Sequence, residues 1–352
     1  MNEKPINSSY IRQTNQFNVL KYLCGCQETT IADLAKLCNT TIVTLGKIVQ
    51  VLQQKNVISS YANQSGKVGR HGRLYSLNLA QGLFVCMDLT FKENLTAKLY
   101  NVKMQETAYF KKPVKKDYAD AFYALNEDIK DYAVKANMPV LGVGVSIAGI
   151  CDKDADKMLS TLYDWYDQIA PYSFLSNCYK TQNIIIGQDV TFAALAQSKK
   201  LIKNAKESLY YLYIGDGVGG ALVTGNTPYV GADQIAGDTG QVLVNTKEGF
   251  VRLEDIVSID RLLAAKSGDF ERRMEILYSS IYNIVWLINP NYLVINATEG
   301  GINDFIYANI KKFLSDKKPQ IPITTKFMKS DVADASLIGV LQQLTDAYFR
   351  SL

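Results

Sequence analysis

From residue 83 onward, strand-like and helical segments follow one another in an order that limits the fold more than any other feature. Residues 82–114 contain three strand-like runs separated by turns, which predicts an antiparallel meander. A helical pattern follows at 118–136. The stretch VLGVGVSIAGICD at 140–152 then predicts a buried strand that ends in a glycine turn.

A similar succession fills the second half of the chain. Residues 183–200 predict a strand, a polar turn and a helix, and 207–231 predict a hairpin around the loop IGDGVGG. A long helix at 272–289 ends before Pro290, and a strand at 291–297 and a last helix at 333–349 complete the chain. Strands followed by alternating strands and helices, twice over, predict an α/β protein of two lobes with a cleft between them.

Composition narrows the class of protein. The 352 residues suffice for two or three domains, and 47% hydrophobic with 20% charged residues is typical of a soluble globular chain. No apolar run approaches the roughly 20 residues that cross a bilayer, and the polar N-terminus lacks a secretory signal. Six cysteines without a CxxC pair, and one histidine, argue against a zinc site. We expect a cytoplasmic protein with reduced cysteines, no metal, no cofactor and no membrane partner.

The first eighty residues are basic. They carry nine Lys and Arg against three Asp and Glu, so their net charge is +6, and the chain total of +4 leaves −2 for the remainder. This layout is typical of a DNA-reading domain joined to a different module. Charge alone leaves open a basic domain that is merely soluble.

Three short helical patterns follow one another in this basic segment, at 11–26, 29–38 and 41–56. Thr30 with Asp33 offers a capping box for the second helix, and Thr40 or Thr41 offers a cap for the third. Asn39 interrupts the pattern between them. Two short helices joined by such a turn predict a helix-turn-helix.

In a helix-turn-helix, the N-terminal part of the second helix enters the major groove. Hydroxyls and a lysine suit phosphate and base-edge contacts, and a valine methyl can meet a thymine methyl. The predicted DNA contacts here are Thr41, Val43, Thr44 and Lys47. An exposed helix face without a partner is the alternative.

Residues 56–79, NVISSYANQSGKVGRHGRLYSLNL, predict two strands around a glycine-containing turn, which is the wing of a winged helix. Glycines let the backbone lie close to DNA, and arginines on such a loop reach phosphates or a narrow minor groove. The predicted DNA contacts of the wing are Lys67, Arg70, His71 and Arg73. A double-stranded DNA operator is therefore an expected partner.

The order of these segments resembles the ROK family of repressors, open reading frames and sugar kinases, in its repressor branch. The resemblance rests on the wing GRHGRLYSLNL and on GVGVSIAGICD, GQDVTFAALAQ, IAGDTGQVLV, INPNYLVINATEGG and ADASLIGV. It implies an α/β fold in which an N-terminal winged helix-turn-helix precedes a two-lobed, actin-like (ribonuclease-H-like) sugar kinase body. The expected domains are 1–80, 81–195 for the first lobe and 196–352 for the second.

An actin-like kinase needs two turns that handle phosphate. The resemblance places the first at MDLTFKEN, residues 87–94, where Asp88 and Thr90 remain but no glycine lets the backbone approach a triphosphate. The second is the loop at 215–220, whose glycines also suit a tightly packed hairpin. We therefore expect that the chain is not an enzyme; an active ATP-dependent sugar kinase with a DNA-binding head is the alternative.

The resemblance also implies a carbohydrate site. Asp189 stands at the family's base position, and a carboxylate there can accept two sugar hydroxyls without catalysis. The family's zinc cysteines are absent from NTKEGFVRLEDIVS, and Gln241 replaces a histidine ligand. The expected sugar-binding residues are Gly149, Gln188, Asp189, Asp238, Gln241 and Glu254. Solvated turn residues are the alternative.

Together these observations predict a sugar-responsive transcriptional regulator, a repressor, whose partners are a DNA operator and a sugar or sugar-derivative effector. Two-fold dimers that read near-palindromic sites are the default for such heads, so a homodimer or homotetramer is expected. A regulator that answers to a protein partner and binds no sugar is a further alternative.

Overall fold

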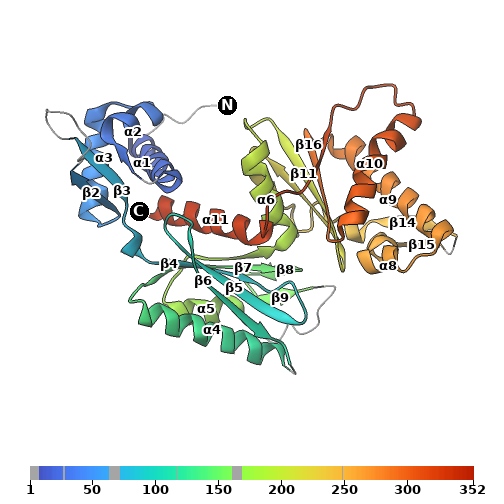
Figure 1. The fold of residues 1–352 in the computed structure, drawn as a ribbon, viewed down its shortest axis with the longest axis horizontal. Helices are drawn as coiled ribbons and strands as arrows, with labels where there is room; N and C mark the ends of the chain where they lie inside the picture. Colours follow the sequence, from blue (N-terminus) through green and yellow to red (C-terminus); the bar gives the residue numbers. More distant parts are fainter. Residues whose placement is uncertain (1–7, 27, 63–71, 116, 161–168, 248) are drawn as a thin grey trace. The chain divides into compact units, whose positions relative to one another are not determined.

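The computed structural model describes residues 8–26, 28–62, 72–115, 117–160, 169–247 and 249–352. The chain divides into two compact units. The first unit comprises Met1–Val145, Gln168–Ile186 and Val340–Leu352, and the second comprises Ser146–Asp167 and Gly187–Gly339. Figure 1 colours the elements of both units along the chain.

The N-terminal head of the first unit is a winged helix. Helices α1 (Ser8–Gly25), α2 (Ile31–Leu37) and α3 (Ile42–Gln54) pack with a sheet of order β1-β3-β2, formed by Thr29–Thr30, Arg73–Leu77 and Ile58–Ala62. The apolar stripes of the three helices meet in a core that includes Leu20, Leu23, Leu34, Leu45 and Leu52, each with none of its surface exposed. The predicted helices and the two wing strands are confirmed.

Side-chain caps begin the two helices of the helix-turn-helix. Thr30 accepts the backbone N–H of Asp33 at 3.2 Å and donates to its carboxylate at 2.7 Å. Thr41, one of the two predicted caps, accepts the N–H of Thr44 at 3.2 Å. Asn39 lies between the helices in the left-handed region, with φ of 46°, which ends α2.

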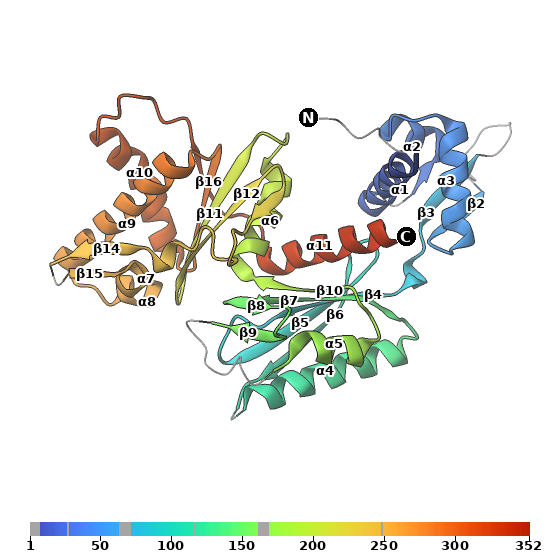
Figure 2. The same cartoon turned by 180° about the vertical axis from the view of Figure 1, so that it is seen from behind.

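The first unit also holds a five-stranded sheet of order β10-β7-β4-β5-β6. The predicted meander is β4 (Leu83–Asp88), β5 (Asn94–Asn101) and β6 (Glu106–Pro113), and the other strands are β7 (Val140–Ile147) and β10 (Ile184–Gln188). Figure 2 shows α4 (Tyr118–Lys135) and α5 (Pro171–Tyr179) together on one face of this sheet and α11 (Ala335–Ser351) on the other. Gly144 of β7 has no room for a side chain, because Leu344 of α11 would lie 3.0 Å from its Cβ.

The second unit repeats this topology. Its sheet has the order β13-β12-β11-β16-β17, formed by Thr227–Tyr229, Val218–Thr224, Ser208–Ile214, Tyr292–Ala297 and Lys326–Lys329. In chain order both sheets therefore run 3-2-1-4-5. Strand β11 pairs with β12 in the antiparallel direction and with β16 in the parallel direction. The same order twice is the duplicated α/β architecture that the sequence predicts.

Helices complete the second sheet. Helices α9 (Ser267–Ile288) and α10 (Gly300–Asp316) pack on one face, against Leu293 and Ile295 of β16. Helix α6 (Asp189–Leu201) packs on the other face, where Val190 lies against Gly219. The predicted long helix begins five residues earlier than expected, at Ser267, and ends at Ile288 with Asn289 in the left-handed region.

Several elements of the second unit were not predicted. They are α10, β17, the short helices α7 (Glu254–Val257) and α8 (Ile259–Leu263), and the hairpin β14–β15 (Leu243–Thr246 and Gly249–Arg252). For α10 a signal exists, because Ile302, Ile306, Ile310 and Leu314 recur every four residues and are buried. The short helices and the hairpin depend on tertiary packing and carry no comparable period.

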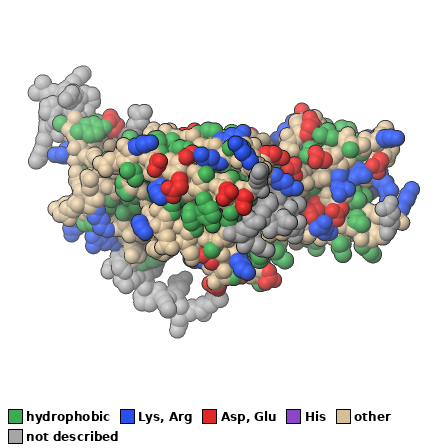
Figure 3. Space-filling model, turned by 90° about the horizontal axis from the view of Figure 1, so that it is seen from below, with side chains coloured by type: hydrophobic (Ala, Val, Ile, Leu, Met, Phe, Trp, Pro, Cys, Tyr) green, Lys and Arg blue, Asp and Glu red, His purple; other side chains and the backbone are tan. Residues whose placement is uncertain are grey.

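In the described part of the chain, no helix combines the length and the apolar character that a membrane span requires. On the face shown in Figure 3, acidic and basic side chains of the described residues are interspersed with hydrophobic ones. The six cysteines are free thiols, and Cys38, Cys86 and Cys151 are buried.

Candidate functional site

The N-terminal turn of α3 presents the side chains predicted to contact DNA. Val43 has 72% of its surface exposed, and Thr41, Thr44 and Lys47 are exposed as well. The Thr41 hydroxyl also caps the helix and donates to the Thr44 hydroxyl at 3.0 Å. An exposed valine beside hydroxyls and a lysine is a surface suited to a major groove.

The wing behind α3 is an antiparallel pair in which Ala62 is opposite Arg73. The Arg73 guanidinium donates to the Ser60 hydroxyl, with Nη2 at 2.8 Å, so this arginine is held along the wing. Lys67, Arg70 and His71 lie in residues 63–71, outside the described residues.

Three of the predicted sugar-binding residues form one cluster in the second unit. Gln241 donates from Nε2 to Glu254 Oε1 at 2.8 Å, and Glu254, the first residue of α7, has only 11% of its side chain exposed. Asp238 precedes the 3₁₀ turn Thr239–Gln241 and accepts a hydrogen bond from the Gly240 backbone. A Cβ at 240 would clash with the Val218 backbone, 3.0 Å from its carbonyl carbon, so only glycine fits this turn, which brings residue 240 next to Glu254.

Burial next to a second carboxylate raises the pKa of Asp238 above that of an ordinary aspartate. Desolvation, and then the charge of Glu254, raise the pKa of Asp238 from 3.8 to about 6, against the lowering effect of the Gly240 hydrogen bond. Near neutral pH this side chain therefore accepts hydrogen bonds as an anion, and in mild acid it donates one.

Gln188 and Asp189 form a second group, where β10 meets α6. Gln188 is the N-cap residue of α6, and its Oε1 accepts a hydrogen bond from the Thr191 hydroxyl at 3.3 Å. Asp189 is the first residue of the helix and accepts its neighbour's N–H at 2.8 Å, where the helix dipole favours a negative charge. Gly149 is in the β7–β8 turn, and the atoms nearest to a Cβ there belong to Leu159 and Ser160, with Ser160 Cβ at 3.0 Å, and not to either group.

The glycine pair of β12 lies between the two groups. A Cβ at Gly219 would meet Val190 of α6 at 2.8 Å, and a Cβ at Gly220 would meet the Gly237 carbonyl oxygen at 2.5 Å. The predicted hairpin is confirmed, because Ile214 is opposite Val218 across a three-residue loop. Both glycines are therefore required for close packing, one on each face of the strand.

Two contributors to the cluster were missed from the sequence. Arg252 lies 3.1 Å from Glu254 Oε1 and also binds Asp255, with Nε at 2.9 Å from Oδ2. The buried hydroxyl of Tyr210 donates to the Gly237 carbonyl at 2.6 Å and lies against the Thr239 hydroxyl. The arginine was a usable signal, because it precedes two carboxylates, Glu254 and Asp255, by only two and three residues in the sequence. Nothing local identifies Tyr210.

The turn after β4, at the first predicted phosphate-binding position, is closed on itself. Asp88 Oδ1 accepts the backbone N–H of Thr90 at 3.0 Å and its hydroxyl at 2.5 Å. Among the described residues, no three His, Cys, Asp or Glu side chains lie close enough together to hold a metal ion.

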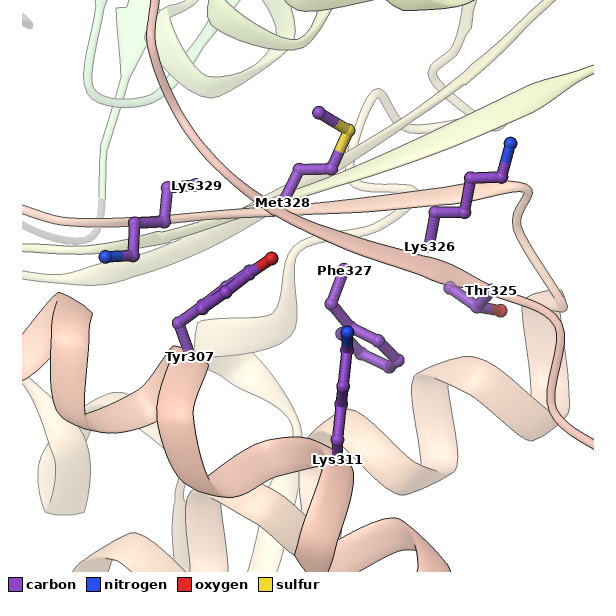
Figure 4. A pocket seen from close by; sticks show the side chains of 7 residues that line it. All are labelled: Tyr307, Lys311, Thr325, Lys326, Phe327, Met328 and Lys329. Atoms are coloured by element: carbon purple, nitrogen blue, oxygen red, sulfur yellow. The ribbon is translucent and has the colours of Figure 1, made fainter.

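A groove of about 610 Å³ lies elsewhere in the second unit, between α10 and the edge strand β17 (Figure 4). Its polar walls are Lys311, Lys326 and Lys329, of which Lys329 pairs with Asp304 and lies 5.3 Å from the Tyr307 ring centre. Lysines on an edge strand also protect it from pairing with another chain. None of the predicted site residues lines this groove.

Comparison with known proteins gives three kinds of relative. The ROK family model matches residues 92–252. The xylose repressor of Staphylococcus xylosus is 22% identical over 277 residues, which cover 73% of this chain and 69% of the repressor. A xylose repressor of Caldicellulosiruptor bescii is 21% identical over 311 residues, 84% of this chain and 76% of that protein.

Among solved structures, a ROK family transcriptional regulator described as a homologue of the E. coli Mlc protein has a TM-score of 0.76 at 15% identity. The match covers 97% of this chain and 98% of the regulator. A ROK family glucokinase from Streptomyces griseus, solved with glucose and AMPPNP, has a TM-score of 0.56 at 14% identity. It covers 74% of this chain and 98% of the kinase. The fold is thus shared with a regulator over nearly the whole chain and with a kinase over about three quarters of it, and residues 92–252, which follow the winged-helix head, match the ROK family model.

Proposed function

We propose that this chain is a sugar-responsive transcriptional repressor that binds operator DNA as a homodimer or homotetramer and works in the cytoplasm. The observation that carries the proposal is the winged-helix head, with its exposed α3 turn, on the same chain as a ROK domain that retains a carboxylate cluster. Relatives named xylose repressors support the same combination, so D-xylose is the first effector to test.

The head supplies the contacts for DNA. Lys47, with Arg73 and the predicted wing residues Lys67, Arg70 and His71, neutralises phosphates. Val43, Thr41 and Thr44 face base edges. Operator affinity should therefore fall with salt, and the slope against log salt should decrease by about one for each phosphate contact removed.

The ROK domain supplies the effector site. The carboxylates Asp238, Glu254 and Asp189, with the amides Gln188 and Gln241, provide acceptors and donors for a polyol, and Gly149 lets the β7–β8 turn approach it. Such a site binds by charge-assisted hydrogen bonds and needs no bond to be broken. The sugar can change DNA binding only if it binds one arrangement of the chain more tightly than the other.

The test has two steps. A duplex is first selected from a random pool with the full chain, and its affinity is measured with Lys47→Ala and with Lys112→Ala, a control on the first lobe. We expect Lys47→Ala alone to reduce affinity and the salt slope. The affinity is then measured with D-xylose, D-glucose, N-acetyl-D-glucosamine, their phosphates and their acids. Release of DNA by one compound is the expected result, and a chain that selects no duplex contradicts the proposal.

An ATP-dependent sugar kinase is the second candidate, favoured by the retained glycines at 215–220 and by the kinases that share the body fold. The kinase would need to bind MgATP in order to act on a sugar, whereas the repressor needs to bind only sugar and DNA. If no sugar changes DNA binding or thermal stability, a protein effector replaces the sugar.

A further inference from the structure

Helix α11 belongs to both units of the chain. Residues 335–339 lie in the second unit, and 340–351 lie in the first. The helix has 17 residues and contains no proline, so it is about 25 Å of uninterrupted helix. A helix of this kind can transmit a displacement along its axis, because a sharp kink would require a break in its backbone hydrogen bonds.

The first turn of α11 touches the helix that begins at the proposed sugar site. Gly339 packs directly on the backbone of Phe192 in α6, and a Cβ at 339 would lie 2.6 Å from the Phe192 carbonyl carbon. Asp189 is one turn earlier on α6. A displacement of this end of α6 therefore reaches α11 through backbone contact, with no flexible side chain between them.

The other end of α11 holds α1 of the DNA-binding head. Asp346 forms an ion pair with Lys21 at 2.5 Å, with 23% and 32% of the two side chains exposed. The Arg350 guanidinium lies 4.2 Å from the ring centre of Phe17. Partial burial reduces the screening of the ion pair by salt, whereas Arg350 is exposed and its contribution is the stacking of its guanidinium on Phe17.

The same end of α11 also reaches the end of the DNA-reading helix. Lys55, the C-cap residue of α3, donates to the backbone oxygen of Leu352. Tyr348 donates to Gln81 at 2.9 Å, and Gln81 in turn donates to the backbone oxygen of Asn56 at 2.8 Å. Within the first unit, α11 thus contacts α1, the end of α3 and the segment that links the head to the first sheet.

We propose that α11 carries the effect of sugar binding from α6 to the winged helix, and that the Lys21–Asp346 pair with Arg350 on Phe17 is the contact through which the head follows. The inference rests on the proposed function and names its regulation. Without this contact, the operator affinity of the head should be the same with and without bound sugar.

The test measures operator affinity with and without each sugar of the panel for the full-length wild type, Lys21→Glu, Asp346→Lys and the double exchange. Because Lys21 and Asp346 are not among the predicted DNA-binding or sugar-binding residues, the single variants should still bind operator and should keep their sugar affinity within about twofold. Their sugar-induced change in operator affinity should fall from tenfold or more to below about threefold. The double exchange should restore it. Lys112→Glu, which breaks the Lys112–Asp128 pair in the same unit, is the matched control.

Arg350→Ala removes the second contact without introducing a charge, and it replaces the charge reversals if those variants do not fold. Single variants that respond to sugar like the wild type would overturn the role of α11 and leave the repressor intact. A double exchange that stays uncoupled would overturn the role of this ion pair. A wild type whose operator binding ignores every sugar would overturn the proposed function and this inference together.

Discussion

The turn after β4 and the loop between β11 and β12 occupy equivalent places, each following the first strand of its sheet, yet different contacts hold them. The first is closed by local hydrogen bonds from Thr90 to Asp88, two residues apart. The second has one local hydrogen bond, from the Gly215 N–H to the Gly217 oxygen at 2.8 Å, but it also has tertiary contacts. The Ile259 N–H donates to the Gly215 oxygen at 2.8 Å, and in the adjoining strand β12, α6 packs against Gly219 and the 237–239 segment packs against Gly220. The comparison shows that the glycines next to one of these turns are required for packing, whereas the other turn, which contains no glycine, is closed by a carboxylate.

Among the variants that test this comparison, Gly220→Ala should reduce the free energy of unfolding the most. The new methyl group would meet the Gly237 oxygen and the Thr239 hydroxyl, both at 2.5 Å, and would displace the Tyr210 hydroxyl. Overpacking of a site bounded by backbone should cost about 3 kcal/mol of unfolding free energy. Urea denaturation measures it, with Gly268→Ala as the control, since no atom lies within 4 Å of a Cβ there. Equal stability of the two variants would contradict the packing role.

Asp238→Asn tests the segment that packs on Gly220. Because the pKa of Asp238 in the folded protein, about 6, is above its ordinary 3.8, folding favours the protonated acid. That contribution is fully present below about pH 3.8 and is lost as pH rises through 6. The variant should therefore match the wild type near pH 4 and exceed it by roughly 1–2 kcal/mol at pH 8, after allowance for partial solvent screening.

Denaturation curves at the two pH values make this measurement. A difference in stability that is the same at pH 4 and pH 8 would show that the carboxyl does not titrate near 6. Sugar affinity should fall in the same variant, because an amide cannot accept as a charged group does.

Asp88→Ala should reduce the free energy of unfolding by less than Gly220→Ala does. It removes the acceptor for the Thr90 N–H and hydroxyl, and the loss of such local bonds typically costs about 1 kcal/mol. The midpoint of urea unfolding reports this change. A loss as large as that of Gly220→Ala would mean that the first turn, too, depends on tertiary packing.

MgATP should have the smallest effect on thermal stability, with no measurable shift of the unfolding midpoint. A ligand at 100 times its Kd adds about 2.7 kcal/mol to the free energy of unfolding, so MgATP binding would be detected in the same assay as sugar binding. A shift with MgATP would show that the β11–β12 loop still receives phosphate and would favour the kinase.

Much of the head and of the first sheet was predictable. The stripes of α1 to α3, the Thr41 cap, the wing strands and the meander follow from periods and turn residues within about ten positions of one another. The predicted site residues divided differently. Asp238, Gln241 and Glu254 come together because two turns of the second unit meet, whereas Gln188 and Asp189 are at the start of α6 and Gly149 packs against Leu159 and Ser160.

The sequence by itself determined the helices and strands of the head and the principal strands of the two sheets other than β17, since helical stripes, caps and glycine turns depend on short-range sterics and local hydrogen bonds. It did not determine α10 or the short helices and hairpin of the second unit. Only the tertiary structure decided that Arg252 and Gln241 hold Glu254, that packing occupies the glycines of β12, and that α11 contacts the head. Lys21 and Asp346 are 325 residues apart, and no local pattern relates them. Contacts of that kind form only when two sheets of the same order have folded and their helices have found the faces they cover.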